Sequence, residues 1–397
     1  MEFYIITGIK AALIAFVLLT AAAYMVWLER KVLAHIQLRV GPTRVGPHGL
    51  LQPLADAIKL LTKEDLNPPQ ANTFFYLLAP FLAVMLSLVS IAVIPFGPEV
   101  DIFGFKTYLQ LTDLSIGVLV VLAVSSLSVY GVSLAGWASN SKYALLGGLR
   151  SSAQMISYEL PLAMAVVAPL LIHNSLSFRE IVNAQSGYYF GVLPQWSIFA
   201  SPFPQIFSFI LFLIAAFAET NRVPFDLPEA ENELVAGFHT EYSSMKFAAF
   251  FTAEYINILT ICCVATLLFL GGWTPLWSAD YGSDLVPVLL HLAAAGILFF
   301  HGSQPARPTD RYTFPAAGVV FAALGLTFLI PPLKPVLIPI FWFVGKTVFL
   351  AFLFIWVRGT LPRFRYDQLM RFAWTFMFPA AVLNLLVTSL LVAVTSK

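Results

Sequence analysis

The chain alternates between long apolar runs and short polar links. A helix that crosses a bilayer needs about 20 mostly apolar residues, and ten runs approach that length. They lie near residues 4–28, 74–96, 114–136, 153–172, 197–218, 246–270, 285–301, 313–332, 336–357 and 373–394. Because the bilayer interior offers no water to the backbone, each crossing segment must be helical. The pattern predicts an all-α polytopic membrane protein that forms a single transmembrane domain over residues 1–397.

The seventh and eighth runs are the weakest of the ten. Pro287 and His291 interrupt the seventh run, and Pro331-Pro332 ends the eighth. Both runs lie in the segment 274–335. Two arrangements stay open: eight core transmembrane helices with two extra spans in this segment, or eight spans with the segment packed outside them.

Residues 50–63 are too short to span a membrane but have a helical pattern of their own. Apolar residues recur at helical spacing on one face, and charged residues share another face. The apolar positions are Leu51, Leu54, Ile58 and Leu61, and the charged positions are Asp56, Lys59 and Lys63. Such a segment predicts an amphipathic helix that lies in the membrane interface.

The composition supports a place in the bilayer. Hydrophobic residues make up 59% of the chain and charged residues 11%, with a mean hydropathy of +0.83, whereas soluble domains carry about 25% charged residues. The net charge of +1 offers no basic field for nucleic acid. The two cysteines, Cys262 and Cys263, are adjacent inside an apolar run, which is typical of small apolar helix residues.

Lysine and arginine indicate the orientation of the predicted helices. Alternate links hold 16 of the 22 Lys and Arg residues, whereas Lys106 and Arg179 are the clear cases in the opposite links. The basic links are 29–73, 137–152, 219–246, 302–312 and 358–372. Because positive residues concentrate in cytoplasmic loops, these links are predicted to be cytoplasmic and both termini periplasmic.

Carboxylates gather on the same predicted side. Six of the 21 Asp and Glu residues lie in one cytoplasmic loop, 219–246. They are Glu219, Asp226, Glu229, Glu231, Glu233 and Glu241. Glu159 and Glu254 lie in the inner part of the fourth and sixth runs, and Glu29 ends the first. Together these residues predict a chain of carboxylates that leads from the loop into the membrane.

Structural interpretations compete with a functional one. Asp226 and Glu229 resemble the cap of a helix start around Pro228, and Glu29 resembles an interfacial anchor. Glu159 and Glu254 are harder to explain in this way, because an ionisable residue at depth costs about 2.5–3.5 kcal/mol on insertion scales and usually has a function. Carboxylates this close hold protons as a group. The cluster therefore predicts a proton relay, or the acidic part of a site that protonates a substrate.

The basic residues suggest partners for these acids. Arg222 and the run 363–367 are the positions expected to pair with the acids or to dock another subunit. No Gly-rich phosphate loop, zinc spacing or Ser/His/Asp arrangement stands out in the sequence. We therefore expect no metal site in this chain, and we expect another subunit to bring the electrons if the chain takes part in electron transfer.

Several long stretches resemble the quinone-site membrane subunit of respiratory complex I, the proton-pumping NADH:quinone oxidoreductase. They are ERKV (29–32), QLRVGP (37–42), QPLADAIK (52–59), GWASNSKYA (136–144), SYE (157–159), the acidic stretch 218–247, AEY (253–255) and PRFRYDQLM (362–370). The resemblance covers residues 1–272 and 336–394. The segment 274–335 departs from it, because the family usually has a much shorter link there and eight spans.

The resemblance implies a quinone tunnel and an acidic path. Tunnel positions are matched by Arg30, Arg39, Asp56 and Lys59, and quinone contacts are also expected at Glu29 and Arg222. The acidic path is matched by Glu219, Asp226, Glu229, Glu231, Glu233, Glu159 and Glu254. The chain is then expected to bind no cofactor of its own. Quinone would be the substrate, and FMN and iron–sulfur clusters would reside in partner subunits.

The family also implies partners and a location. The expected partners are hydrophilic iron–sulfur and quinone-site subunits, neighbouring small membrane subunits, and the lipid bilayer. The extra spans favour a bacterial cell inner membrane over an organelle. Two alternatives stay open: the membrane anchor of a related hydrogenase or ferredoxin-linked complex, and a stand-alone secondary transporter. The tunnel residues favour complex I, and the lack of an internal repeat disfavours the transporter.

Overall fold

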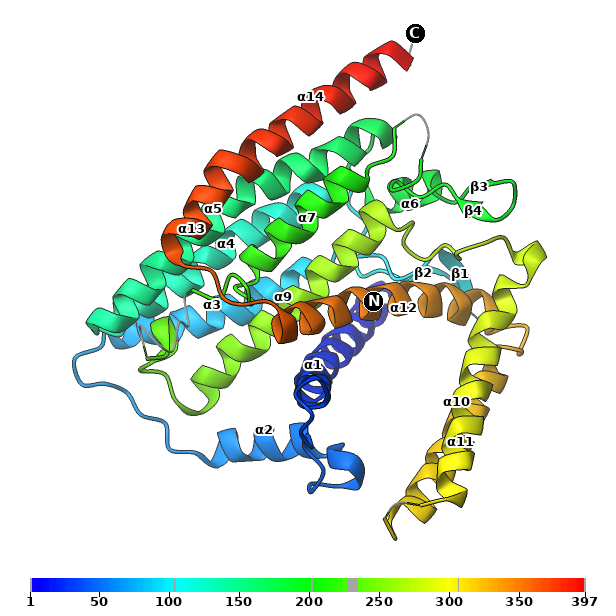
Figure 1. The fold of residues 1–397 in the computed structure, drawn as a ribbon, viewed down its shortest axis with the longest axis horizontal. Helices are drawn as coiled ribbons and strands as arrows, with labels where there is room; N and C mark the ends of the chain where they lie inside the picture. Colours follow the sequence, from blue (N-terminus) through cyan, green and yellow to red (C-terminus); the bar gives the residue numbers. More distant parts are fainter. Residues whose placement is uncertain (1, 103–104, 201–202, 228–234, 306, 396–397) are drawn as a thin grey trace.

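Long apolar helices make up most of the structure (Figure 1). The computed structural model describes residues 2–102, 105–200, 203–227, 235–305 and 307–395, apart from the side chains of residues 2, 3, 5, 102 and 105. The helices are α1 (Glu2–Ile36), α2 (Gln52–Thr62), α3 (Thr73–Ile91), α4 (Gly117–Ala138), α5 (Lys142–His173), α6 (Phe178–Ala184), α7 (Ile206–Glu219), α9 (Ser244–Phe269), α10 (Val286–Ser303), α11 (Asp310–Thr327), α12 (Lys334–Thr360), α13 (Tyr366–Phe372) and α14 (Phe378–Thr395). Single turns are η1 (Pro47–Gly49), η2 (Gly237–His239), η3 (Ala279–Tyr281) and η4 (Ser283–Leu285), and the π-helical turn η5 (Ala373–Met377) joins α13 to α14.

Eight helices in the described part of the chain are long and apolar enough to cross a membrane. They are α1, α3, α4, α5, α9, α10, α12 and the continuous run from α13 to α14. The predicted all-α polytopic membrane fold is therefore confirmed. The set differs from the eight predicted core spans, because α7 has only 14 residues and α10 comes from the segment 274–335.

Several helix boundaries differ from the apolar runs. α5 begins at Lys142, so most of the predicted basic link 137–152 is helical, and Glu159 lies in the middle of a 32-residue helix. The last helical run begins at Tyr366, ahead of the predicted start at residue 373. α7 begins at Ile206, although the apolar run starts at residue 197. A hydropathy window misses the polar ends of helices such as the start of α5. An apolar run that contains Pro204 need not be helical throughout, which explains the later start of α7.

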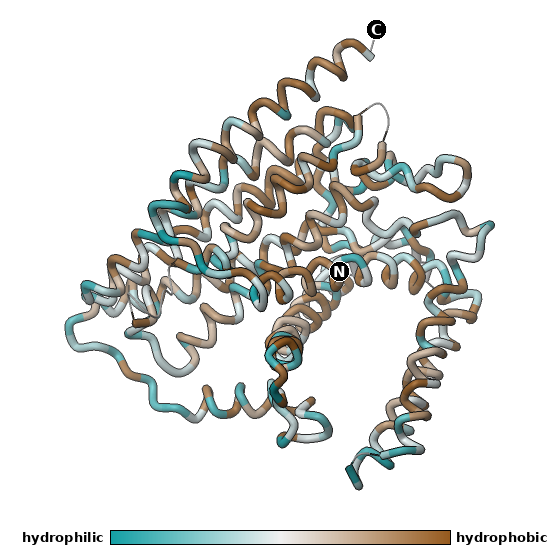
Figure 2. Tube along the Cα trace, in the orientation of Figure 1, coloured by the Kyte–Doolittle hydropathy of each residue, from teal (hydrophilic) through white to brown (hydrophobic). Residues whose placement is uncertain are grey.

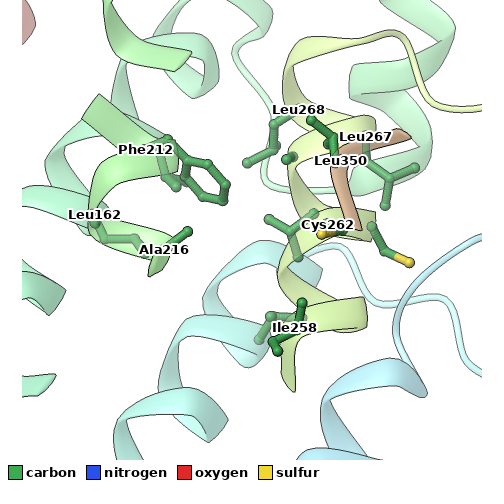
Figure 3. Packing of buried hydrophobic residues seen from close by; sticks show 14 of the residues in the cluster. Leu162, Phe212, Ala216, Ile258, Cys262, Leu267, Leu268 and Leu350 are labelled. Atoms are coloured by element: carbon green, nitrogen blue, oxygen red, sulfur yellow. The ribbon is translucent and has the colours of Figure 1, made fainter. Parts of the chain in front are cut away.

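The central core joins α5, α7, α9 and α12. Figure 3 shows Leu162 from α5 and Phe212 from α7 facing the side chains of α9, with Leu350 from α12 beside them. Cys262 and Cys263 are buried in this core as free thiols, which confirms that they serve as small apolar residues. A helix that is apolar on all sides is buried or faces lipid, and here α9 takes the buried position.

One end of the bundle collects the basic links, and we call it the basic end. α1, α7 and α12 end there, and α5, α9 and α13 begin there. Figure 2 shows hydrophilic residues at this end and apolar residues along the middle of the helices. At the opposite end, two small antiparallel hairpins that the sequence did not predict pair β1 (Glu99–Ile102) with β2 (Phe105–Tyr108), and β3 (Tyr188–Tyr189) with β4 (Leu193–Pro194).

At the opposite end, a buried lysine of α12 bonds to the segment that follows α9. Nζ of Lys346, in α12, donates to the carbonyls of Leu270 at 2.6 Å, Gly272 at 2.9 Å and Thr274 at 2.6 Å. Its ammonium also lies 4.1 Å from the centre of the Trp196 ring. The last carbonyls of a helix lack intrahelical donors, so Lys346 supplies donors where α9 ends and the chain turns toward α10.

The segment 274–335 folds into a hairpin of α10 and α11, which stands to one side of the bundle (Figure 1). Its base packs on the start of α12 through Val288, Phe328 and Trp342. α10 meets the length and apolarity of a span, whereas α11, which begins with Asp310 and Arg311, does not. Whether α11 crosses the membrane stays a prediction.

A helix also occupies the amphipathic segment. α2 covers Gln52–Thr62 and has no buried residue. Leu54, Ile58 and Leu61 are all more than half exposed. An apolar face left uncovered by the chain itself needs lipid or another protein against it, which supports the predicted interfacial position of α2.

Candidate functional site

Glu29 lies at the centre of a buried polar cluster at the basic end. Its side chain is only 6% exposed. Arg358 of α12 forms an ion pair with Glu29 Oε1, and the Tyr255 hydroxyl of α9 donates to Oε2 at 2.7 Å. An interfacial anchor would keep its carboxylate in water, so this burial excludes the anchor interpretation of Glu29.

Arg222 joins Glu29 to a second acid. Its Nε lies 2.7 Å from Glu254 Oε1, and its Nη1 lies 3.7 Å from Glu29 Oε1. The guanidinium also lies 4.3 Å from the centre of the Tyr255 ring. Arginine suits this position because its planar fork can address two carboxylates and an aromatic face together. One cation thus bridges acids from α1 and α9.

The loop 220–227 carries Arg222 and is held on both sides. Gln154 of α5 donates from Nε2 to the carbonyls of Ala218 and Phe225, each at 2.7 Å. Arg363, just after α12, forms an ion pair with Asp226 at 2.7 Å. Asp226 is therefore a buried ion-pair partner, and the predicted pairing of Arg222 and Arg363 with the acids is confirmed.

Glu219, the last residue of α7, borders two small cavities. The first has a volume of about 60 Å³ and extends to Glu254 and His239. The second, of about 40 Å³, lies toward α4, where Ser125 faces the Glu219 carboxylate. Asn257 lines both cavities. Each volume suffices for a water molecule, which needs about 10–15 Å³ of such space and polar partners.

Glu159 reaches the same part of α4 from the middle of α5. The hydroxyl of Ser126 donates to the Glu159 carboxylate. Because Ser126 directly follows Ser125, adjacent serines on α4 contact two different acids. Polar side chains thus run from Glu29 through Arg222, Glu254 and Glu219 to Glu159.

A close backbone contact positions one wall of the first cavity. A side chain on Gly147 of α5 would lie 2.7 Å from the backbone nitrogen of Phe238. Glycine is therefore needed for η2 to lie directly against α5. This contact fixes the turn that carries Phe238 and His239 into the cavity lining.

The predicted tunnel residues lie in different parts of the basic end. Arg30 pairs with Asp56 of α2 at 2.8 Å, and Gln52 donates to the same carboxylate at 3.0 Å. Lys59 is exposed on α2. Arg39 lines a separate cavity beside α11. Glu29 and Arg222, also expected as quinone contacts, lie in the buried polar cluster, and their contact with quinone stays a prediction.

Three predicted acids lie outside the described residues: Glu229, Glu231 and Glu233. The helix-cap interpretation of Glu229 also concerns residues outside the described ranges. Within the described ranges, no group of three or more His, Cys, Asp and Glu side chains could hold a metal ion.

Sequence reasoning missed several members of the cluster. Tyr255, Asn257 and His239 were not singled out, and neither were Ser125 and Ser126. Tyr255 follows Glu254 directly and Asn257 lies three residues beyond it, so both are polar positions near a buried acid on one helix. The adjacent serines interrupt the third apolar run, and such polar pairs within a predicted span are the signal that was available.

The fold and this cluster define a class of protein: a polytopic helical membrane protein with ion-paired carboxylates buried at one end. The NADH dehydrogenase family model matches residues 9–389. An NADH-quinone oxidoreductase subunit of Solibacter usitatus is 62% identical over 396 residues, covering 100% of this chain and 99% of its own. The corresponding NADH-quinone oxidoreductase subunit of Koribacter versatilis is 48% identical over 98% of both chains.

The chain belongs to the NADH dehydrogenase family. A third relative, an NADH-quinone oxidoreductase subunit of Protochlamydia amoebophila, is 47% identical and covers 93% of this chain and 92% of its own. Because the Solibacter relative aligns with the whole chain, the segment 274–335 has a counterpart in at least that protein. The segment is therefore not peculiar to this chain.

Proposed function

We propose that this chain, a membrane subunit of proton-translocating NADH:quinone oxidoreductase, forms the membrane entry of the quinone site and couples quinone reduction to proton movement through its carboxylates. The observation that carries the proposal is the continuous polar contact from Glu29 through Arg222 and Glu254 to the cavities beside Glu219. The names of the relatives favour this role over the anchor of a hydrogenase or ferredoxin-linked complex.

The entry would lie where α2 meets the end of α1. The Arg30–Asp56 ion pair joins these helices, and α2 turns exposed apolar side chains outward. A quinone is largely apolar with a polar ring, so an apolar helix face beside a fixed charge pair suits its passage from lipid. A hydrophilic partner subunit would complete the site, and its iron–sulfur cluster would supply the electrons.

The carboxylates would compensate the charge that quinone reduction creates. A quinone that takes two electrons must take two protons to become quinol. Acids held in a buried group share protons, so a change of charge near Glu29 alters the proton affinity of Glu254 through Arg222. Glu219 and Glu159, with the serines of α4, would carry that change along the membrane.

The location follows the distribution of basic residues. We place the basic end in the cytoplasm and both termini in the periplasm of a bacterial cell inner membrane, because the links at the basic end hold most of the Lys and Arg residues. The partner subunits that bring FMN and iron–sulfur clusters would dock on this end.

Replacing Glu219 with Gln tests the relay. We expect the complex to assemble and proton uptake into membrane vesicles to fall about tenfold or more, because a positioned proton-transfer group contributes about 10²–10⁴-fold. Inhibitor-sensitive quinone reduction by NADH and proton uptake would be measured together. Glu180→Gln is the matched control, since Glu180 is exposed at the opposite end and hydrogen-bonded to Ser175.

The outcomes separate the two halves of the proposal. Lost uptake with persistent quinone reduction would assign Glu219 to coupling alone. Loss of both activities would assign the acids to the quinone chemistry or to a tightly coupled step. Normal coupled activity in Glu219→Gln would refute the relay through Glu219.

A further inference from the structure

A larger cavity lies away from the acidic cluster, between the link after α1 and the tip of the α10–α11 hairpin. Its volume is about 400 Å³. Lys31 and Arg39 line it from the α1 side, and Arg307 and Asp310 line it from the hairpin. The cavity therefore exists only because the segment 274–335 folds back to the basic end.

The charges in this cavity favour an anion. Lys31, Arg39 and Arg307 are basic side chains, and none of them has an ion pair with a carboxylate among the residues that the structure describes. The carboxylate of Asp310 is 6% exposed and lies 3.1 Å from His48 Nε2. Three cations thus face one carboxylate that already has a partner.

The walls of the cavity are fixed to each other. The His48 ring stacks on Phe314 of α11 with centroids 4.8 Å apart, in addition to its contact with Asp310. The turn that presents His48 has left-handed backbone at Gly46, His48 and Gly49, with φ of 72°, 53° and 78°. A side chain on Gly49 would collide with the Pro42 carbonyl oxygen, so this turn requires glycine.

Exposed apolar residues lie among the residues that line this cavity or next to them in the chain. Leu38 is 97% exposed and Val40 78% on the link, and Phe300 near the end of α10 is 61% exposed. A small soluble anion would leave this apolar surface uncovered. A phosphate group attached to acyl chains would use both the cations and the rim.

We propose that this cavity binds the phosphate headgroup of an anionic phospholipid, which seats the α10–α11 hairpin against the end of α1. Basic pockets between membrane helices are suited to such headgroups, because Lys and Arg residues near a membrane surface attract anionic lipid. The proposal does not depend on the role of the chain in quinone reduction.

The test uses the whole purified complex in discs of phosphatidylcholine that contain a photoactivatable phosphatidylglycerol. Crosslinks should map to peptides around residues 31–48 and 300–314 and should be displaced by unlabelled phosphatidylglycerol. Arg307→Gln should lower the crosslink yield about fivefold, the equivalent of ~1 kcal/mol, and Arg307→Lys should keep most of it. The control is Arg311→Gln, which removes a nearby exposed charge that does not line the cavity.

Several outcomes would overturn the proposal. Displacement of the probe by inorganic phosphate as readily as by phosphatidylglycerol would assign the cavity to a free anion. An equal loss in Arg311→Gln would reveal general surface attraction. A cavity that crosslinks to an acidic segment of another subunit, and not to lipid, would make it a protein contact. Quinone reduction measured beside the yield shows whether each variant complex is intact.

Discussion

Arg222→Leu should destabilise the complex by about 3–5 kcal/mol, the usual cost of removing one partner from a buried ion pair. The change would leave Glu254 without its 2.7 Å cation and would remove the second cation near Glu29. Among the described residues, Arg358 would then be the remaining cation in an ion pair with Glu29. The thermal unfolding midpoint of the purified complex and its rate of quinone reduction should both fall.

Matched variants isolate the cause. Arg365→Leu removes an arginine whose contact with Asp367 is 3.9 Å long and whose side chain is 79% exposed, and such a pair is worth about 0–1 kcal/mol. The double variant Arg222→Leu with Glu254→Gln should recover part of the lost stability, because it also removes the negative charge that Arg222 faced. Arg222→Lys should remain impaired, since an ammonium cannot reproduce the fork. An Arg222→Leu complex as stable as Arg365→Leu would show that the bridge contributes little.

Lys346→Met should also lower stability, by about 3 kcal/mol or more. Hydrogen bonds to a charged group contribute about 1.5–3 kcal/mol each and do not add simply, and Lys346 makes three of them with backbone carbonyls. Methionine keeps a similar apolar length but leaves these carbonyls without the ammonium donor. The amount of assembled complex in membranes and its unfolding midpoint would report the loss.

The control for this prediction lies on the same helix. Lys334 begins α12, pairs with Asp284 at 2.8 Å and is 46% exposed, so Lys334→Met should change stability by about 0–1 kcal/mol. If Lys346→Met complexes unfold at the same temperature as Lys334→Met complexes, other donors must satisfy the carbonyls of the segment after α9.

The helices were largely predictable from the apolar runs. A segment inside the bilayer must satisfy its backbone hydrogen bonds internally, and a helix does so. The predicted run 246–270 became α9 with a shift of one or two residues. The helix predicted for the run 197–218 was wrong in its first part. Apolar composition does not distinguish a lipid-facing helix from a buried irregular segment. The prediction also missed the polar first turns of α5. These turns lie outside the apolar run, and contacts with the rest of the protein keep them helical.

The acids and Arg222 of the site were predictable, whereas its uncharged polar members and most of its contacts were not. Charge at depth pointed to Glu159 and Glu254, and both occupy the cluster. The contact between Glu29 of α1 and Arg358 of α12 joins residues more than 300 positions apart, and no local pattern encodes such a contact. The same limit explains why Arg39 was grouped with Arg30, although the two line different parts of the basic end.

The loop that follows the short helix α7 lies well inside the bundle. Gln154, which holds the loop after α7, lies 12 residues into α5, or about 18 Å from the start of that helix at 1.5 Å per residue. Glu254 lies 10 residues into α9, or about 15 Å by the same measure. The side chains of Arg222 and Glu254 are 7% and 18% exposed, against 48% and 25% for Arg30 and Asp56, and salt screens partly buried charges less than exposed ones. Dissolved salt therefore screens the Arg222–Glu254 contact far less than the more exposed Arg30–Asp56 contact, and the recessed charges keep their mutual influence across a wide range of ionic strength.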